Sequence, residues 1–319
     1  MKIQHQDLEI VAACRNPAKL ITQYEGEVRR GDLRDENYLD RMLVGVDIIC
    51  HAAGWSSFEK STTDKCTKAY LEPTIDLINH ANEWRISRFI NLSSIYVCTA
   101  WQRNTPTAKG KPQRDWPMIN CHIAVEDYMR NIDQPRCQFI NLRVGLYSGK
   151  RLNMGLLALL LNRCDTATLP FITGLLGHFP IIDGRDIGQA FARAALGPFE
   201  SSYNNLNIVG PESPSHREVM AFIKEQIQVS PLSVGLAHYL ANPLLWLQGK
   251  IHSVDKQPLI TSAMLEMLKS PPVQNTLATQ QIGYDPEISW QASLLDTLEL
   301  YKNQSLNKDI SQFDKPLNI

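Results

Sequence analysis

The chain has 319 residues, 44% of them hydrophobic, and a formal net charge of −1 at pH 7. This size and composition predict a globular protein with one large α/β domain, or a nucleotide-binding domain with a smaller lobe. The near-zero charge gives no reason to expect nucleic acid or an anionic membrane as a partner.

Seven cysteines are scattered along the chain, without the short spacings that zinc sites use. Several lie in apolar runs, where a thiol serves as a small hydrophobic side chain. An odd number of free thiols is typical of a reducing compartment, so we expect a cytoplasmic protein without a metal site. The N-terminus does not resemble a signal peptide, and no run reaches the roughly 18 apolar residues of a membrane span.

Short apolar, β-branched runs alternate with segments of helical periodicity over the first half of the chain. Apolar strands separated by helices of about 10–20 residues are typical of a parallel sheet covered on both faces. The sequence therefore predicts an α/β fold with a doubly wound parallel sheet. The expected strands are 8–14, 26–33, 45–54, 85–94 and 137–149, and the expected helices are 35–43, 64–84 and 120–132.

After residue 150 the pattern predicts a helix, a Gly/Pro-rich loop, a short strand and a helix opened by Asp186. A further strand and helix follow. Ser215 and Glu218 have the spacing of a capping box, in which two side chains bind the first N–H groups of a helix.

These elements suggest a division of the chain into two parts. We expect residues 1–149, completed by about 180–212, to form the nucleotide-binding part. Residues 150–179 and 213–302 would form a smaller, mainly helical lobe that selects the substrate. A polar tail would follow over 303–319.

Ligands of an open parallel sheet collect beyond the carboxyl ends of its strands. There, Arg15 could meet a 2′-phosphate, and Asp32 could accept a hydrogen bond from an adenine amino group. Small residues at Ala52, Ala53 and Gly54 would let a flat ligand lie against the backbone. The complete set of candidate residues at strand ends is Arg15, Asp32, Leu33, Ala52, Ala53, Gly54, Ser94, Tyr96, Arg143 and Val144.

This ordered set is similar to that of the extended short-chain dehydrogenase/reductases, the NAD-dependent epimerase/dehydratase family, close to its 3β-hydroxysteroid dehydrogenase and dihydroflavonol reductase branches. The stretch from "VAACRNPAKL" to "GVDIICHAAG" resembles that family's second to fourth strands, and "FINLSSIYV" resembles its catalytic-serine strand. "NLRVGLYSG" resembles its Arg-Pro-Gly strand, with Val144 in place of proline. The resemblance covers about residues 8–302.

The resemblance implies a Rossmann-like fold that binds NAD or NADP. It also implies a small-molecule substrate, either a sugar nucleotide or another hydroxylated compound. Ser94 would hydrogen-bond the reacting carbonyl group. Relatives are typically homodimers, here through the helices at 64–84 and 120–132.

The chain lacks the Gly-rich turn, G-x-x-G-x-x-G, that this family places after its first strand to hold the pyrophosphate. In dinucleotide folds the ribose-reading residue follows those glycines by roughly 20 residues. If Arg15 has this role, the glycines would precede Met1, and the chain would begin within the first helix. That first strand is central in the sheet, so we expect an opening between strands 8–14 and 45–53.

The stretch DWPMINCHIAVEDYMRN (115–131) begins the helix on which the family carries a Tyr-x-x-x-Lys pair. Met118 stands at the tyrosine position and His122 at the lysine position, where the family holds the nicotinamide ribose. A thioether has no proton to donate, and an imidazole with a pKa of about 6.5 is mostly neutral at pH 7.

Two roles for His122 are open. It could assist Tyr96, whose phenol would share a face with Ser94 if that strand continues. Alternatively, it could pair with Glu126 one helical turn later, a structural contact of a few tenths of a kcal/mol.

Three hypotheses about function follow. The first is an NAD(P)-dependent oxidoreductase or epimerase that uses Ser94 and an unusual acid. The second is a non-catalytic dinucleotide or ligand sensor on the same fold, and the third is an inactive, truncated gene product. The position of Arg15 favours NADP over NAD.

Overall fold

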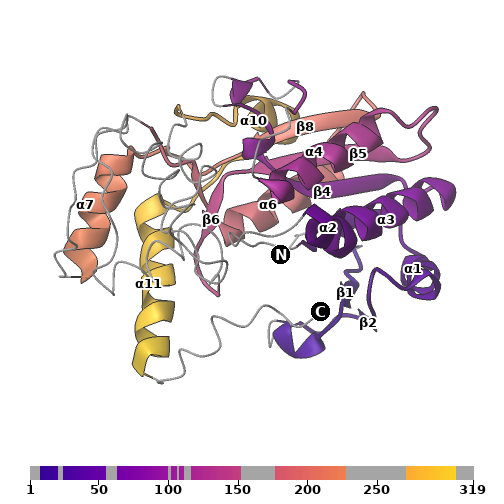
Figure 1. Ribbon diagram of the computed structural model, residues 1–319, viewed down its shortest axis with the longest axis horizontal. Helices are drawn as coiled ribbons and strands as arrows, with labels where there is room; N and C mark the ends of the chain where they lie inside the picture. The colour runs from indigo at the N-terminus through magenta and orange to yellow at the C-terminus, as the bar shows by residue number, and fades with distance from the viewer. Residues whose placement is uncertain are drawn as a thin grey trace.

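The computed structural model describes residues 8–20, 24–54, 63–99, 102–105, 108–110, 116–151, 177–227 and 271–306. Most of the predicted substrate lobe, at 152–176 and 228–270, lies outside these residues. In the described part, helices cover both faces of a parallel sheet (Figure 1). The predicted α/β class with a doubly wound sheet is therefore confirmed.

The main sheet has four parallel strands in the order β3-β4-β5-β8. They are β3 (Ile48–His51), β4 (Arg88–Ser94), β5 (Gln138–Val144) and β8 (Tyr203–Ile208). Phe89 and Phe139 pack on one face, and the next residues, Ile90 and Ile140, pack on the other. This alternation explains the near-continuous apolar sequence, because both faces of a covered strand are buried.

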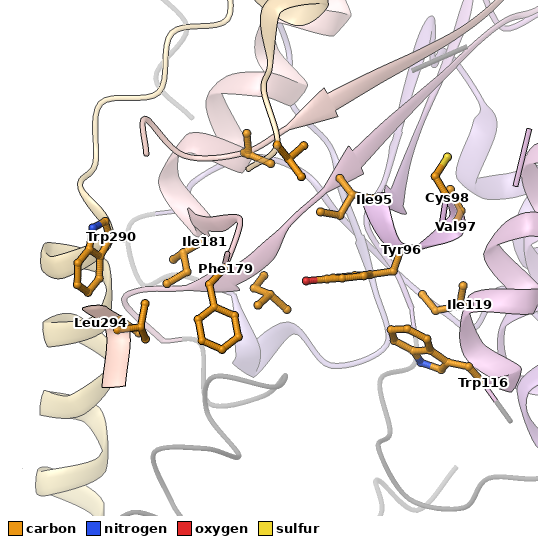
Figure 2. Close-up of a cluster of buried hydrophobic side chains, with 14 of the residues drawn as sticks. Ile95, Tyr96, Val97, Cys98, Trp116, Ile119, Phe179, Ile181, Trp290 and Leu294 are labelled. Atoms are coloured by element: carbon orange, nitrogen blue, oxygen red, sulfur yellow. The ribbon is translucent and has the colours of Figure 1, made fainter. Parts of the chain in front are cut away.

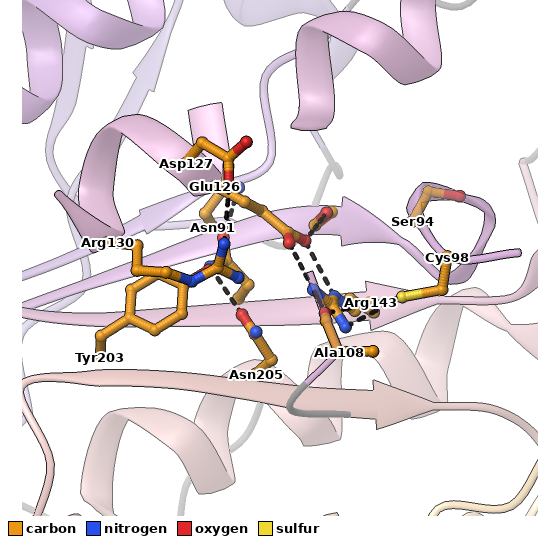
Figure 3. A network of polar contacts seen from close by, with 12 residues as sticks. Asn91, Ser94, Cys98, Ala108, Glu126, Asp127, Arg130, Arg143, Tyr203 and Asn205 are labelled. Carbon is orange, nitrogen blue, oxygen red and sulfur yellow. Dashed lines mark hydrogen bonds and ion pairs between the residues drawn. The ribbon is translucent and has the colours of Figure 1, made fainter. Parts of the chain in front are cut away.

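A buried ladder of amide side chains crosses three strands of this sheet (Figure 3). Asn91 Nδ2 donates to Asn141 Oδ1 at 2.9 Å, and Asn141 Nδ2 donates to Asn205 Oδ1 at 3.0 Å. The three residues are register partners on β4, β5 and β8. A register slip would leave buried amides unpaired at about 1–3 kcal/mol each, so the ladder favours a single alignment of the strands.

Two smaller parallel sheets accompany the main one. One joins β1 (Ala12–Cys14) to β2 (Val28–Arg30), and the other joins β6 (Leu146–Ser148) to β7 (Ile181–Asp183). Within the described ranges, no strand links β1 to β3, and Figure 1 shows β1 and β2 set apart from the main sheet. Strands β1 and β3 therefore belong to different sheets in the described part of the chain.

Helices form one layer on each face of the main sheet. The first face carries α1 (Glu36–Leu43), α3 (Glu72–Glu83) and α4 (Pro117–Arg130), and the second carries α6 (Gly184–Leu196) and α10 (Thr276–Ile282). Leu39, Leu77 and Val125 are fully or almost fully buried in the first layer. Each such side chain contributes roughly 1.5–3 kcal/mol of hydrophobic stabilisation.

A third apolar cluster joins later segments to the end of β4 (Figure 2). It includes Ile95, Phe179 and Leu294, with further side chains from α7 (His216–Ile227) and α11 (Trp290–Leu306). The cluster packs these two late helices against the short turn Ile95–Val97, which directly follows Ser94.

The helical run at 63–83 changes pitch partway along. It consists of α2 (Thr63–Cys66), a π-helical turn η2 (Thr67–Leu71) and α3. Pro73 has no N–H group, and its ring would clash with the carbonyl of the residue four positions earlier in an α-helix. The N–H of Glu72 instead bonds to the carbonyl of Thr67, five residues back. The wider turn accommodates the proline.

The predicted start of α6 is wrong by three residues. The cap is Asp183, whose carboxylate accepts from the N–H of Arg185 at 2.8 Å. Asp186 lies inside the helix and accepts hydrogen bonds from the N–H groups of Glu287 and Ile288, each at 3.2 Å. Both carboxylates sit near one helix start, and only long-range contacts distinguish their roles.

The capping box of α7 is confirmed. Ser215 Oγ accepts from the N–H of Glu218 at 3.2 Å, and Glu218 Oε2 accepts from the N–H of Ser215 at 2.7 Å. The predicted boundary of the tail is wrong, because α11 continues to Leu306, past residue 303.

Candidate functional site

The ends of β1 and β2 bring together the first two predicted ligand contacts. Arg15 Nη1 lies 4.0 Å from Asp32 Oδ2, and their side chains are 55% and 33% exposed. Arg34 also holds Asp32, with Nη2 2.7 Å from Oδ2. The hydrogen bonds from Arg34 lower the pKa of Asp32 to about 2, so the carboxylate stays ionised at neutral pH. The Leu33 side chain packs against the core, which leaves its backbone for any ligand contact.

The end of β3 is open and made of small residues, as the sequence predicts. Ala52, Ala53 and Gly54 are all exposed. A Cβ atom built on Gly54 would meet nothing nearer than a ring carbon of Tyr70 at 4.0 Å. His51, just before them, is buried at 4% exposure, with Nε2 3.2 Å from Thr74 Oγ1.

Strand β4 ends at Ser94, the predicted catalytic serine. Its Oγ accepts from the N–H of Tyr96 at 3.2 Å and begins a short 3-10 turn over Ile95–Val97. The strand therefore does not continue, and the predicted placement of Tyr96 on the face of Ser94 is wrong.

Tyr96 instead enters the third apolar cluster (Figure 2). It is 2% exposed, its ring lies 5.6 Å from that of Trp116, and the guanidinium of Arg103 lies 4.6 Å from its ring centre. Burial raises the pKa of this phenol. The arrangement is that of a core aromatic side chain.

At the mouth of α4, Met118 is partly buried and packs against two apolar clusters. His122, one turn later, is partly exposed and hydrogen-bonded to Tyr70: Nδ1 lies 2.9 Å from the phenol oxygen. Burial, together with the nearby His51, lowers the pKa of His122 to about 4. The imidazole is therefore neutral at pH 7.

The predicted pairing of His122 with Glu126 is wrong, because Glu126 binds Arg143 (Figure 3). The distances are 3.0 Å from Nε to Oε1 and 2.5 Å from Nη2 to Oε2, and Ser93 donates to Oε1 at 2.7 Å. Each side chain of the ion pair is 1% exposed. Val144 is also buried, at 4%. Arg143 and Val144 do lie at the end of β5, as the sequence predicts, but both side chains are buried there.

Sequence reasoning missed two residues of this region. Arg34 could have been found, because an arginine two residues after a strand-end aspartate can bind that carboxylate. No local pattern links Tyr70 to His122, which lies 52 residues later. Their contact depends on the packing of η2 against α4.

Two further findings concern all of the described residues. Among the described residues, no cluster of three His, Cys, Asp or Glu side chains could hold a metal ion. In the same part of the chain, no helix combines the length and apolar character that crossing a membrane requires.

The profile of the NAD dependent epimerase/dehydratase family matches residues 3–208, about two thirds of the chain. The chain belongs to this family. The resemblance inferred from the strand ends is thereby confirmed. No curated protein matches the sequence significantly.

Solved structures of sugar-nucleotide enzymes have a similar fold. WbmG of Bordetella bronchiseptica, in complex with NAD and UDP, superposes with a TM-score of 0.64 at 14% identity, covering 93% of this chain and 88% of WbmG. UDP-glucose 4-epimerase of Thermus thermophilus, bound to NAD, gives 0.65 at 15% identity, covering 92% and 91%. UDP-glucuronic acid 4-epimerase of Bacillus cereus, bound to its named sugar nucleotide and NAD, gives 0.64 at 15%, covering 93% and 91%. Identities this low establish a shared fold only.

Proposed function

We propose that this chain is an NAD(P)-dependent oxidoreductase or epimerase that acts on a sugar nucleotide or a related hydroxylated small molecule. The observation that carries the proposal is the partly exposed Arg15–Asp32 contact at the ends of two adjacent parallel strands. It presents a cation and a carboxylate at the edge where this fold binds dinucleotides. The similar structures that contain NAD with UDP or UDP-glucuronic acid support the substrate class.

The residues at the strand ends fit the adenosine portion of a dinucleotide. Arg15 would meet a 2′-phosphate, Asp32 would accept from the adenine or ribose, and the backbone of Ala52–Gly54 would lie against the ligand. Ser94 and His122 would contact the nicotinamide side. When bound, the cofactor would supply hydride transfer. No Gly-rich turn that would hold the pyrophosphate occurs within the described residues.

A second candidate is a dinucleotide sensor without turnover. It is favoured because none of the side chains considered as proton donors is suited to that role. Met118 carries no acidic proton, Tyr96 is enclosed in the core, and His122 is neutral. A cation at the His122 position would stabilise a phenolate nearby, and a neutral imidazole does so far less.

Binding and turnover can be tested separately. NADPH and NADH would be titrated into the purified chain by calorimetry, and UDP-glucose and UDP-glucuronic acid would then be assayed with NAD⁺ and NADP⁺. We expect NADPH to bind more tightly than NADH. Arg15→Ala should weaken NADPH binding about 10- to 100-fold, the effect of losing one charge-assisted hydrogen bond, and should spare NADH. Arg41→Ala, which removes an exposed cation from α1, is the matched control.

The outcomes distinguish the hypotheses. Binding with turnover supports the enzyme, and binding without turnover of either sugar nucleotide supports the sensor. Absence of binding to both nucleotides would refute both candidates.

A further inference from the structure

Tyr70 and His122 form a hydrogen-bonded pair between two helical segments on the first face of the sheet. The phenol oxygen lies 2.9 Å from Nδ1, and the ring centres are 4.9 Å apart at an angle of 59°. Tyr70 is 3% exposed, whereas His122 is partly exposed. The pair therefore has a buried member and a member that reaches the protein surface.

The local sequence explains how Tyr70 reaches α4. It lies in the π-helical turn that Pro73 imposes on the 63–83 helical run. One extra residue in a turn rotates the rest of the helix by about 100°. The side chains beyond that turn therefore point to a different side of the helix. Single π turns are often found at functional sites, and this one places a phenol within hydrogen-bond distance of His122.

Neutral histidine has one protonated ring nitrogen, and the hydrogen bond to Tyr70 selects which one. Burial raises the pKa of Tyr70, so its hydroxyl group keeps its proton, while His122 stays unprotonated at pH 7. If the phenol donates to Nδ1, the buried hydroxyl proton is satisfied and the imidazole proton resides on Nε2. The opposite tautomer would use Nδ1–H as donor and leave the phenol proton in need of another acceptor.

We propose that Tyr70 is a positioning residue that holds His122 as the Nε2–H tautomer, so that the site offers a neutral hydrogen-bond donor to an oxygen atom of its ligand. The ligand atom would be a hydroxyl or carbonyl oxygen of the nicotinamide ribose or of the substrate. This ligand role rests on the proposed function.

Burial and one neighbouring side chain, His51, keep the donor uncharged. The ring of His51 lies 6.4 Å from that of Tyr70, and burial lowers the pKa of His51 to about 4. A proton on either histidine would repel a proton on the other. The pair thus discriminates against anionic groups, which a lysine at the His122 position would attract, and favours neutral oxygen acceptors.

The first test measures the tautomer in the protein without ligand. Long-range ¹H–¹⁵N correlation spectra at pH 7 distinguish a protonated Nε2 from a protonated Nδ1. We expect Nε2–H in the wild type and a mixture of tautomers in Tyr70→Phe, which removes only the hydroxyl group. Tyr128→Phe is the matched control, because it removes a hydroxyl group that bonds Asn79 at the α3–α4 contact. An Nδ1–H wild type, or an unchanged spectrum in Tyr70→Phe, would overturn the proposal.

The second test measures the ligand role with NADPH and UDP-glucose as probes. Tyr70→Phe should weaken binding of at least one probe about 3- to 10-fold, as expected for a single neutral hydrogen bond, with the thermal midpoint of Tyr70→Phe recorded to confirm folding. His122→Gln, which keeps an acceptor and a donor, should retain more affinity than His122→Leu.

The two proposals fail differently. If the wild type binds both probes and Tyr70→Phe binds them equally well, the positioning role is wrong and the proposed function stands. If the wild type binds neither of these probes nor NADH, the proposed function fails, and the tautomer measurement still decides whether Tyr70 controls His122.

Discussion

Acidification should destabilise this protein through His51, and the size of the effect follows from its surroundings. The imidazole is 4% exposed, and its ring centre lies 6.4 Å from that of Tyr70 and 5.8 Å from that of Phe89. Burial lowers its pKa from 6.5 to about 4. The unfolded chain therefore takes up a proton near pH 6.5, whereas the folded chain resists protonation until about pH 4.

The direction in which stability changes with pH follows from this difference between the folded and the unfolded state. At His51 the folded state binds fewer protons than the unfolded state. The contribution of this residue to stability is therefore constant above about pH 7 and falls as the pH decreases from 6.5 toward 4. Each pKa unit corresponds to about 1.4 kcal/mol, and integration from pH 7 to pH 5 gives a loss on the order of 2 kcal/mol for this residue.

The assay is urea unfolding of the wild type and of His51→Gln at both pH values. Gln is neutral throughout and can still bond to Thr74, the partner of His51 in the wild type. The wild type will also lose stability through His122 and His216, whose pKa values are likewise lowered to about 4. The difference between the two proteins reports mainly on His51, whose replacement also removes its repulsion of a proton on His122, and we expect the variant to lose about 2 kcal/mol less. Equal losses would show that burial of His51 does not oppose its protonation.

Three further predictions concern stability, each measured by chemical denaturation. Glu126→Gln leaves the guanidinium of Arg143 without a counter-charge and should lower the free energy of unfolding by about 3–5 kcal/mol. Glu126→Leu combined with Arg143→Met removes both charges and should recover most of this loss. If the single and the double variant lose equal stability, the unpaired charge is not the cause. Gly145→Ala should destabilise by about 1–3 kcal/mol because its Cβ would overlap a backbone carbonyl oxygen, while Gly188→Ala in α6 has open space and should stabilise by about 0.5–1 kcal/mol. Ser215→Ala should cost about 1 kcal/mol, and no loss would show that the capping box is dispensable.

The succession of strands and helices along the chain, and the position of part of the site, could be predicted from the sequence. Apolar runs such as those around Phe89 and Phe139 predict covered strands because parallel strands are buried on both faces. The proximity of Arg15 and Asp32 was predictable because neighbouring parallel strands end at the same edge. The capping box at Ser215 was predictable because both of its partners lie within four residues.

The contacts of the polar side chains around α4 could not be predicted from the sequence, because they depend on tertiary packing. A 3-10 turn after Ser94 sends Tyr96 into the core, although continuation of the strand would have placed it on the same face as Ser94. Glu126 binds Arg143 from a different element and leaves His122 to Tyr70. These partners lie 17 and 52 residues apart, so their contacts arise from the packing of α4 against the sheet and against η2. Local periodicity identifies the helix, but which buried groups neutralise one another depends on the elements that pack beside it.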